Sequence, residues 1–170
     1  TTVLASRNQE KLEELCRELT RSRHLPPACR QARHLGVGGH RFDIPFLAVR
    51  TDVKNEEDCR QLVEKTISTF GRIDVLINNA GISMRALLKD VDLKVLKELM
   101  DTNFWGTVYC TKYALPYLIT SAGCLVGISS VLGKIPAPGR SGYCASKYAM
   151  EGFLDSVRVE TLHRRLKVLV

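Results

Sequence analysis

The sequence predicts an α/β fold in which a parallel sheet carries helices on both faces. Short apolar segments alternate with longer segments whose apolar residues recur at helical spacing, as in parallel α/β proteins. Ile73–Ile77 is almost continuously apolar, as expected of a strand covered on both sides, and Cys124–Ile128 is predicted to be another buried strand. With 170 residues, 45% of them hydrophobic and 25% charged, the chain fits one domain and is not expected to be disordered.

The N-terminal part is predicted to hold two strands and one helix. Thr2–Ala5 is an apolar, partly β-branched run that fits a strand, and Ser6–Gln9 has the pattern of a capping box for the helix that follows. Prolines and glycines at about residues 21–43 predict a basic loop that is unusually long for a compact domain. Pro45–Val49 is the next predicted strand.

The rest of the chain is predicted to alternate helices with strands. A helix begins after Asn55, whose side chain can cap it, and stops near Phe70–Gly71. Its acidic first turn suits the positive end of the helix dipole. A long helix begins at Asp90 or Asp92 and continues toward Leu115. The remaining predicted elements are a helix from Ser141 to about His163 and strands at Ile73–Ile77, Cys124–Ile128 and Leu166–Val170.

The net charge of +7 is concentrated in one segment. Leu19 to Phe42 contains five arginines and no acidic residue. A nucleic-acid patch and a solvated basic loop both fit this charge. We favour the loop, because no aromatic residue between Leu19 and Arg41 could stack on bases.

The six cysteines contain no Cys-x-x-Cys pair, which predicts reduced thiols in an intracellular protein. Cys29, His34 and His40 lack a fourth ligand at zinc spacing, so we expect no metal site. The apolar runs are too short to cross a bilayer and no secretory signal opens the chain. We therefore expect a cytoplasmic protein, with a membrane tether upstream of Thr1 left open.

Polar residues follow the predicted strands. The carboxyl ends of parallel strands meet at one edge of the sheet, where ligands bind. The residues that would lie along this edge are Ser6, Arg7, Asp52, Val53, Asn78–Gly81, Ser129 and Ser130.

Tyr143 and Lys147 are four residues apart near the start of a predicted helix and would share one face. A phenol, with an ordinary pKa of about 10, is a poor proton donor or acceptor at neutral pH. A nearby cation favours the phenolate, so such a pair can act as a general acid or base. By itself the spacing is a weak signal.

The combination of motifs is far more specific. It consists of Asn78–Gly81, then Asn103, then Ser130 thirteen residues before Tyr143, and finally Lys147. With matching flanking segments from about Thr2 to Val170, it closely resembles the short-chain dehydrogenase/reductase family. The sequence is most similar to the branch of hydroxysteroid dehydrogenases and carbonyl reductases. The resemblance implies a Rossmann-like, doubly wound sheet.

The resemblance also implies a role for each catalytic candidate. Tyr143 would exchange the proton with the substrate oxygen, and Lys147 would lower the pKa of the tyrosine and hold the nicotinamide ribose. Ser130 would bind the substrate oxygen, and Asn103 would hold a water that links Lys147 to solvent. Taken singly, Asn103 could be a bend in a helix or a buried amide, and Ser130 could be a helix or turn cap. Ser129 is the rival to Ser130.

The implied coenzyme contacts lie after the first three predicted strands. Asn79, Ala80 and Gly81 would pass along the coenzyme, unless they are simple turn residues. Arg7 predicts NADP(H) over NAD(H), because an arginine binds a 2′-phosphate that an acidic residue would repel. The other reading of Arg7 is a solvated surface charge. The further candidates are Ser6 and Asn8 as additional donors and Asp52 and Val53 beside the adenine.

Two parts of the family pattern are absent. No glycine-rich turn precedes Thr2, and the glycines at 36–39 follow a loop instead of a strand. The sequence ends at Val170, before the family's C-terminal substrate region. We therefore expect residues 1–170 to form a single, partial dinucleotide-binding domain. Without the first strand, two strand edges would be unpaired.

The resemblance predicts an NADP(H)-dependent oxidoreductase that transfers hydride between nicotinamide and a carbonyl or secondary alcohol, with Tyr143 as general acid or base. The alternatives are a non-catalytic NADP-binding sensor or scaffold, an inactive fragment, or a nucleic-acid-binding module. We expect a small carbonyl or alcohol substrate, no nucleic acid, and a homodimer or homotetramer. Assembly would use the apolar helices around Phe104–Trp105 and Tyr148–Val157.

Overall fold

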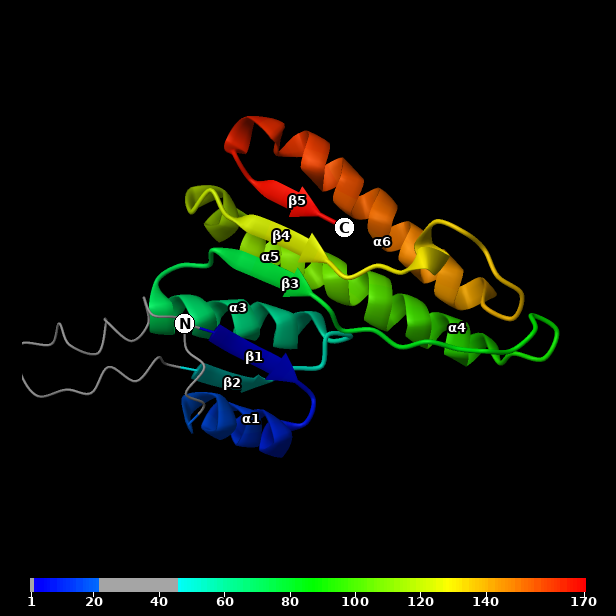
Figure 1. Ribbon diagram of the computed structural model, residues 1–170, viewed down its shortest axis with the longest axis horizontal. Helices are drawn as coiled ribbons and strands as arrows, with labels where there is room; N and C mark the ends of the chain where they lie inside the picture. Colours follow the sequence, from blue (N-terminus) through cyan, green and yellow to red (C-terminus); the bar gives the residue numbers. More distant parts are fainter. Residues whose placement is uncertain (1, 22–45) are drawn as a thin grey trace, which may run out of the picture. The chain divides into compact units, whose positions relative to one another are not determined.

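The computed structural model describes residues 2–21 and 46–170, without the side chains of residues 20 and 21. The chain divides into two compact units, Thr1–Asp52 and Val53–Val170, whose elements are labelled in Figure 1. The predicted basic loop lies outside the described residues, as do Cys29, His34 and His40.

The first unit contains one helix and two parallel strands. Strand β1 (Thr2–Ser6) pairs with β2 (Phe46–Arg50), in a register that places Ser6 opposite Arg50. Helix α1 (Gln9–Arg21) packs against both strands and buries Leu12. The elements agree with the predicted order.

The cap of α1 differs from the prediction. Asn8, not Ser6, caps the helix: its Oδ1 accepts a hydrogen bond from the backbone N–H of Lys11 at 3.0 Å. Ser6 is the last residue of β1, and its hydroxyl accepts from the N–H of Asn8 at 3.3 Å. Strand pairing extends one residue further than the sequence pattern indicates, so the cap moves along the chain.

The second unit contains a three-stranded parallel sheet in the order β3-β4-β5. Among the described strands, β1 pairs with β2 alone and β3 with β4 alone. The strands are β3 (Val75–Asn78), β4 (Cys124–Gly127) and β5 (Lys167–Leu169), and the α-helices are α3 (Glu56–Phe70), α4 (Leu93–Leu99), α5 (Gly106–Thr120) and α6 (Ser141–Glu160).

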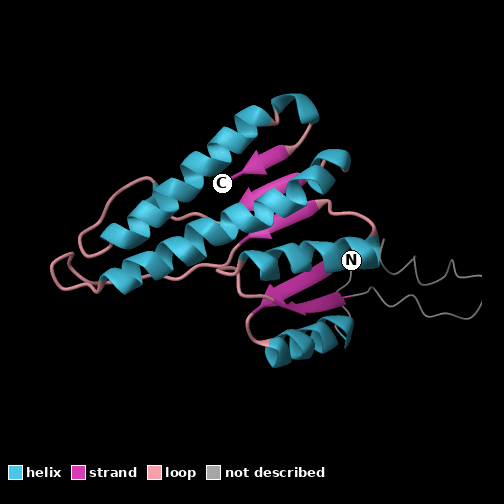
Figure 2. Ribbon diagram, turned by 180° about the vertical axis from the view of Figure 1, so that it is seen from behind, coloured by secondary structure: helices cyan, strands magenta, loops and turns pink. Residues whose placement is uncertain are grey.

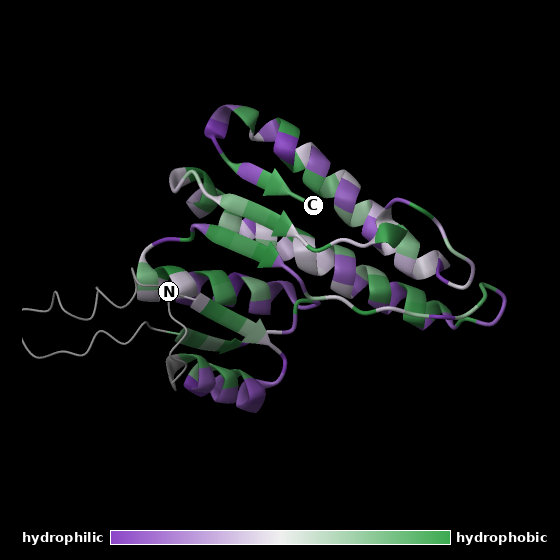
Figure 3. Ribbon diagram, in the orientation of Figure 1, coloured by the Kyte–Doolittle hydropathy of each residue, from purple (hydrophilic) through white to green (hydrophobic). Residues whose placement is uncertain are grey.

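Helices α5 and α6 cover one face of this sheet, and α3 packs beside α5 (Figures 1 and 2). Leu125 of β4 and Leu154 of α6 are completely buried between sheet and helices. Val75 and Ile77 alternate onto the opposite face and are 53% and 58% exposed, although both are apolar (Figure 3). The expectation that β3 is covered on both sides is therefore wrong for the described part of the chain, where no helix of this unit packs on that face.

The predicted long helix is interrupted. Asp92 caps its start, accepting from the N–H of Lys94 at 2.8 Å, but Met100–Trp105 forms a π-helical segment, η2, between α4 and α5. Extra-wide turns of this kind change the direction of the side chains they carry and often occur at functional sites. Here the segment carries Asn103.

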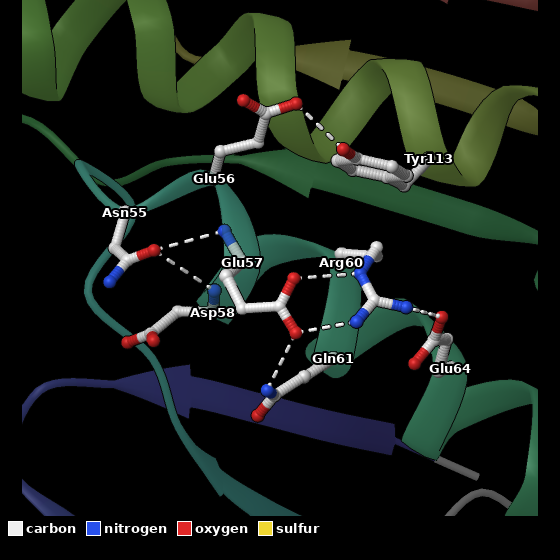
Figure 4. A network of polar contacts seen from close by, with 8 residues as sticks. All are labelled: Asn55, Glu56, Glu57, Asp58, Arg60, Gln61, Glu64 and Tyr113. Carbon is white, nitrogen blue, oxygen red and sulfur yellow. Dashed lines mark hydrogen bonds and ion pairs between the residues drawn. The ribbon is translucent and has the colours of Figure 1, made fainter.

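Helix α3 begins and ends as predicted. Oδ1 of Asn55 accepts from the N–H groups of Glu57 and Asp58 at 2.9 and 3.4 Å, and Gly71 ends the helix at φ 74°. Glu57 accepts hydrogen bonds from the Arg60 guanidinium and from Gln61 (Figure 4). These bonds, Arg60 first, lower the pKa of Glu57 from its ordinary 4.5 to about 2.

This network predicts a pH-dependent contribution to stability. A carboxyl whose pKa is lower in the folded than in the unfolded chain stabilises the fold when ionised. We expect Glu57→Gln to lower the melting temperature at pH above about 5, and the difference from wild type to disappear as pH falls toward about 2. Circular dichroism melts across this range measure it. Because the pair is exposed, high salt should shrink the effect.

Asp90→Asn is the matched control, since Asp90 is exposed and its carboxylate lies 3.9 Å from the Lys89 ammonium, too far for a hydrogen bond. If Glu57→Gln lowered the melting temperature by the same amount at both ends of the pH range, the proposed contribution of the ionised Glu57 carboxylate to stability would be wrong.

Candidate active site

A pocket of about 200 Å³ lies where β3 and β4 end, beside the first turns of α6. Three separate parts of the sequence meet there: the segment after β3, the segment after β4, and one face of α6. The lining residues are Asn79, Gly81, Ile82, Ser83, Ile128, Ser129, Tyr143 and Lys147.

Tyr143 and Lys147 share the face of α6 that lines this pocket. The Lys147 Nζ lies 5.9 Å from the centroid of the Tyr143 ring. Lys147 is 5% exposed and donates a hydrogen bond to the Ile128 carbonyl at 2.7 Å. Burial lowers the pKa of Lys147, and the Glu151 carboxylate one helical turn further on raises it.

Asn103 is completely buried, and its amide joins two of the segments around the pocket. Its Oδ1 accepts from the Ile82 N–H at 2.8 Å, and its Nδ2 donates to the Ile82 carbonyl and to Ser146 Oγ, both at 2.9 Å. The amide therefore ties the segment after β3 to α6. This matches the buried-amide reading of Asn103; its predicted water-holding role stays a prediction.

Gly81 lies close to the Asn103 amide and to the Lys147 ammonium. A Cβ at this position would lie 3.3 Å from Asn103 Oδ1 and 3.7 Å from Lys147 Nζ. A glycine therefore leaves space beside the ammonium that any other residue would occupy.

The two candidate serines have different surroundings. Ser129 lines the pocket, but its hydroxyl donates to Glu151 Oε1 at 2.5 Å. Ser130 is half-buried, and its Oγ accepts from the Leu132 N–H at 3.2 Å, which caps a short 3₁₀ turn, η3 (Val131–Gly133). Ser130 is not among the described residues that line the pocket. Both hydroxyls therefore have a partner within the protein, and the choice of Ser130 over Ser129 stays a prediction from its spacing to Tyr143.

Arg140 was not identified from the sequence. It stands at the N-cap of α6, and its Nη1 donates to Ser83 Oγ at 2.8 Å and to the Met84 carbonyl at 2.6 Å. These bonds hold the segment after β3 against the start of the helix that carries Tyr143. No local pattern marks such a residue, because its partners lie 56 and 57 positions away.

The first unit has its own open pocket of about 580 Å³ at the carboxyl ends of β1 and β2. Arg7 lines it, and Arg50, which the sequence analysis did not single out, adds a second guanidinium. The full lining is Ser6, Arg7, Asn8, Gln9, Glu10 and Arg50.

Other predicted residues lie outside the two pockets. Asp52 does not line the pocket of the first unit, although the N–H of its neighbour Thr51 pairs with the Ser6 carbonyl at 3.0 Å. Val53 packs in the second unit, where a Cβ on Gly106 would lie 2.8 Å from its Cγ2. Ala80 is exposed beside the second pocket without lining it.

None of the five cysteines in the described part of the chain forms a disulfide with another of them. Within residues 2–21 and 46–170, no group of three or more His, Cys, Asp or Glu side chains could hold a metal ion. No described helix has both the length and the apolar character needed to cross a membrane.

The whole chain matches a known family. A profile described as short chain dehydrogenase matches residues 1–170. The chain belongs to the short-chain dehydrogenase family. Its sequence places it in the hydroxysteroid dehydrogenase branch: it is 43% identical over 141 residues to 11-beta-hydroxysteroid dehydrogenase A of Sesamum indicum. It is 40% identical over 169 residues to dehydrogenase/reductase SDR family member 7B of Bos taurus.

Solved structures of short-chain dehydrogenases have the same fold. An alcohol dehydrogenase of Thermococcus sibiricus complexed with 5-hydroxy-NADP superposes with a TM-score of 0.83 at 19% identity, over 98% of this chain and 62% of that one. A short-chain dehydrogenase of Streptomyces avermitilis gives 0.79 at 25% identity, over 99% and 54%. The Rossmann-like α/β class is confirmed.

This short-chain dehydrogenase sequence spans only part of its relatives. The match to the Sesamum indicum protein includes 82% of this chain but only 39% of that protein. The match to the Bos taurus protein includes 99% of this chain but only 48% of that protein. Both pockets described above lie within the matched family region.

Proposed function

We propose that this chain is the coenzyme-binding and catalytic part of an NADP(H)-dependent oxidoreductase that interconverts a carbonyl and a secondary alcohol. The observation that carries the proposal is the single pocket lined by Tyr143, Lys147 and Gly81, in which the missing side chain of Gly81 leaves space beside the Lys147 ammonium. Membership of an oxidoreductase family supports it.

When bound, the nicotinamide would supply or accept hydride. Tyr143 Oη would give a proton to the carbonyl oxygen in reduction and take one from the alcohol in oxidation. Lys147 would place a positive charge beside the phenol and hold the nicotinamide ribose. Ser130 would hydrogen-bond the substrate oxygen and stabilise charge that develops there. Asn103 would keep the segment with Gly81 at the right distance from Lys147, and would support a water.

The described residues fit such a coenzyme. In the second unit, Asn79, Ala80 and Gly81 follow β3, and the gap at Gly81 opens beside a buried ammonium. In the first unit, the pocket after β1 and β2 is large and carries two guanidinium groups. Asp52 and Val53 remain the proposed neighbours of an adenine.

Arg7 and Arg50 support NADP(H) over NAD(H), because guanidinium groups bind phosphate in bidentate fashion. We expect Arg7→Glu to raise the KM for NADPH at least about tenfold while the KM for NADH stays constant or falls. Steady-state kinetics of the full-length protein with both coenzymes measure this. Arg17→Glu is the control, since Arg17 is exposed on α1 away from this pocket. Equal effects on both coenzymes would refute the 2′-phosphate assignment.

The substrate is proposed to be a small molecule with a carbonyl or secondary alcohol, and no nucleic acid is proposed as a partner. Several curated relatives are named 11-beta-hydroxysteroid dehydrogenases, so a ketosteroid is the first compound to test. We also propose that the protein is cytoplasmic. We propose that it forms a homodimer or homotetramer, because Trp105 and Tyr148 are large apolar side chains that are 43% and 44% exposed.

The test is NADPH oxidation by the full-length protein with a panel of ketones, aldehydes and ketosteroids, with NADPH binding measured separately by fluorescence. Turnover of at least one carbonyl supports the proposal. NADPH binding without any turnover would favour a sensor or scaffold on the same fold. Neither binding nor turnover would indicate an inactive protein.

A further inference from the structure

Glu151 is a buried carboxylate close to the candidate active site that the proposed reaction does not use. It lies on α6 four residues after Lys147 and eight after Tyr143, so the three side chains follow one another along one face of the helix. Only 6% of Glu151 is exposed. A buried carboxylate is costly unless hydrogen bonds or charges compensate it, so its partners define its role.

Both carboxylate oxygens of Glu151 are engaged by the segment that contains Ser130. Oε1 accepts the hydroxyl of Ser129 at 2.5 Å, and Oε2 pairs with the ammonium of Lys134. These two partners lie on either side of Ser130 and of the η3 turn. The Lys134 side chain is 69% exposed, so the bond from Ser129 is the better shielded of the two contacts.

The η3 turn itself rests on this carboxylate. A Cβ on Gly133 would lie 2.4 Å from Glu151 Oε1 and 2.6 Å from Ser129 Oγ. The backbone of the turn therefore packs directly on the Ser129–Glu151 hydrogen bond, at a distance that only glycine allows. Tyr148, also on α6, donates its hydroxyl to the Lys134 carbonyl at 2.5 Å and holds the far end of the turn.

Ser130 lies between Ser129 and Lys134, the two residues of this segment that α6 binds. Its Oγ accepts from the Leu132 N–H at 3.2 Å, and its carbonyl accepts from the Gly133 N–H at 2.8 Å. Ser130 and the turn thus lie between Ser129 and Lys134, the two residues that Glu151 holds against α6. The same helix carries Tyr143 and Lys147.

We infer that Glu151 is a positioning residue that, through Ser129 and the η3 turn, holds the Ser130 hydroxyl at a constant place relative to Tyr143. The inference rests on the proposed function for its catalytic part. The contacts to Ser129 and Lys134 stand independently of it.

The surroundings of Lys147 agree with this role. The Glu151 carboxylate raises the pKa of Lys147, against the larger lowering caused by burial. Lys147 in turn donates to the carbonyl of Ile128, one residue before Ser129. Two side chains of α6 therefore hold consecutive residues of the segment that leads to Ser130.

The experiment compares Glu151→Gln and Ser129→Ala with a matched control, Asp155→Asn. Asp155 lies one turn further along α6, is exposed, and pairs with Arg158 on its own helix. Ser129→Ala leaves the carboxylate and its charge in place, so it serves if Glu151→Gln does not fold. Amide hydrogen exchange at Leu132 and Gly133 reports the turn, and kcat and KM are measured on the full-length protein.

We expect both variants to lose about tenfold in exchange protection at Leu132 and Gly133, with the core amides of β4 unchanged. We expect kcat to fall about tenfold or more while the Kd for NADPH is constant. In a Ser130→Ala background, Ser129→Ala should cost no further activity, because it acts through Ser130 and leaves the Glu151 charge near Lys147 in place.

Unchanged exchange protection would overturn the inference. So would a double variant whose loss in kcat equals the product of the losses caused by Ser130→Ala and by the second substitution. Altered exchange with unaltered kcat would overturn its catalytic part. If the wild-type protein turned over no carbonyl, the proposed function would fail, and the exchange data alone would decide whether Glu151 positions the turn.

Discussion

Tyr143→Phe is expected to reduce turnover by at least about a hundredfold, the contribution typical of a general acid or base. The variant keeps the aromatic ring beside Lys147 and removes only the hydroxyl that would exchange the proton. NADPH binding should therefore change little. Carbonyl reduction by the full-length protein, together with the Kd for NADPH, measures the two effects separately.

Tyr117→Phe is the control for this prediction. Tyr117 lies on α5, is 38% exposed, and does not border the pocket. Wild-type turnover in Tyr143→Phe would show that another group handles the proton. A parallel loss of NADPH binding would show that the hydroxyl holds the coenzyme rather than the substrate.

Leu125→Ala is expected to destabilise the fold by about 2–5 kcal/mol, whereas Ile77→Ala costs less than about 1 kcal/mol. The two residues lie on neighbouring strands of one sheet, but on opposite faces. Leu125 is 0% exposed beneath α5 and α6, and Ile77 is 58% exposed. Removing Leu125 leaves a cavity that the packed helices cannot fill. Denaturant unfolding of the chain gives both free energies.

A large loss in Ile77→Ala would mean that the apolar face with Val75 and Ile77 is covered in solution. A small loss in Leu125→Ala would contradict the position of the core. The contrast between the variants is the informative quantity, since both remove an apolar side chain from a strand.

Local chemistry in the sequence was sufficient to predict most of the elements. Asn55 can cap a helix with its own side chain, and Gly71 can adopt the left-handed conformation that ends one, so α3 follows from a few adjacent residues. The pairing of Tyr143 with Lys147 follows from helical geometry alone. The family pattern added Asn103 and Ser130 by their spacing.

Local chemistry failed where two patterns competed or where an element continued. Ser6 and Asn8 are both suitable caps, and the pairing of β1 with β2 decided between them. The apolar run of β3 cannot indicate which face a helix covers. Likewise, a helical periodicity from Asp92 onward does not reveal the π-helical segment that carries Asn103.

By itself, the sequence determined the class of fold, the order of its elements and the tyrosine–lysine pair, because these depend on neighbouring residues and on spacing along one helix. Only the tertiary structure decided that Ser129 bonds Glu151, that Arg140 holds the segment after β3, and that Asn103 bonds Ile82. Each of these contacts joins residues at least 21 positions apart. The burial that makes such contacts strong exists only after the chain has folded.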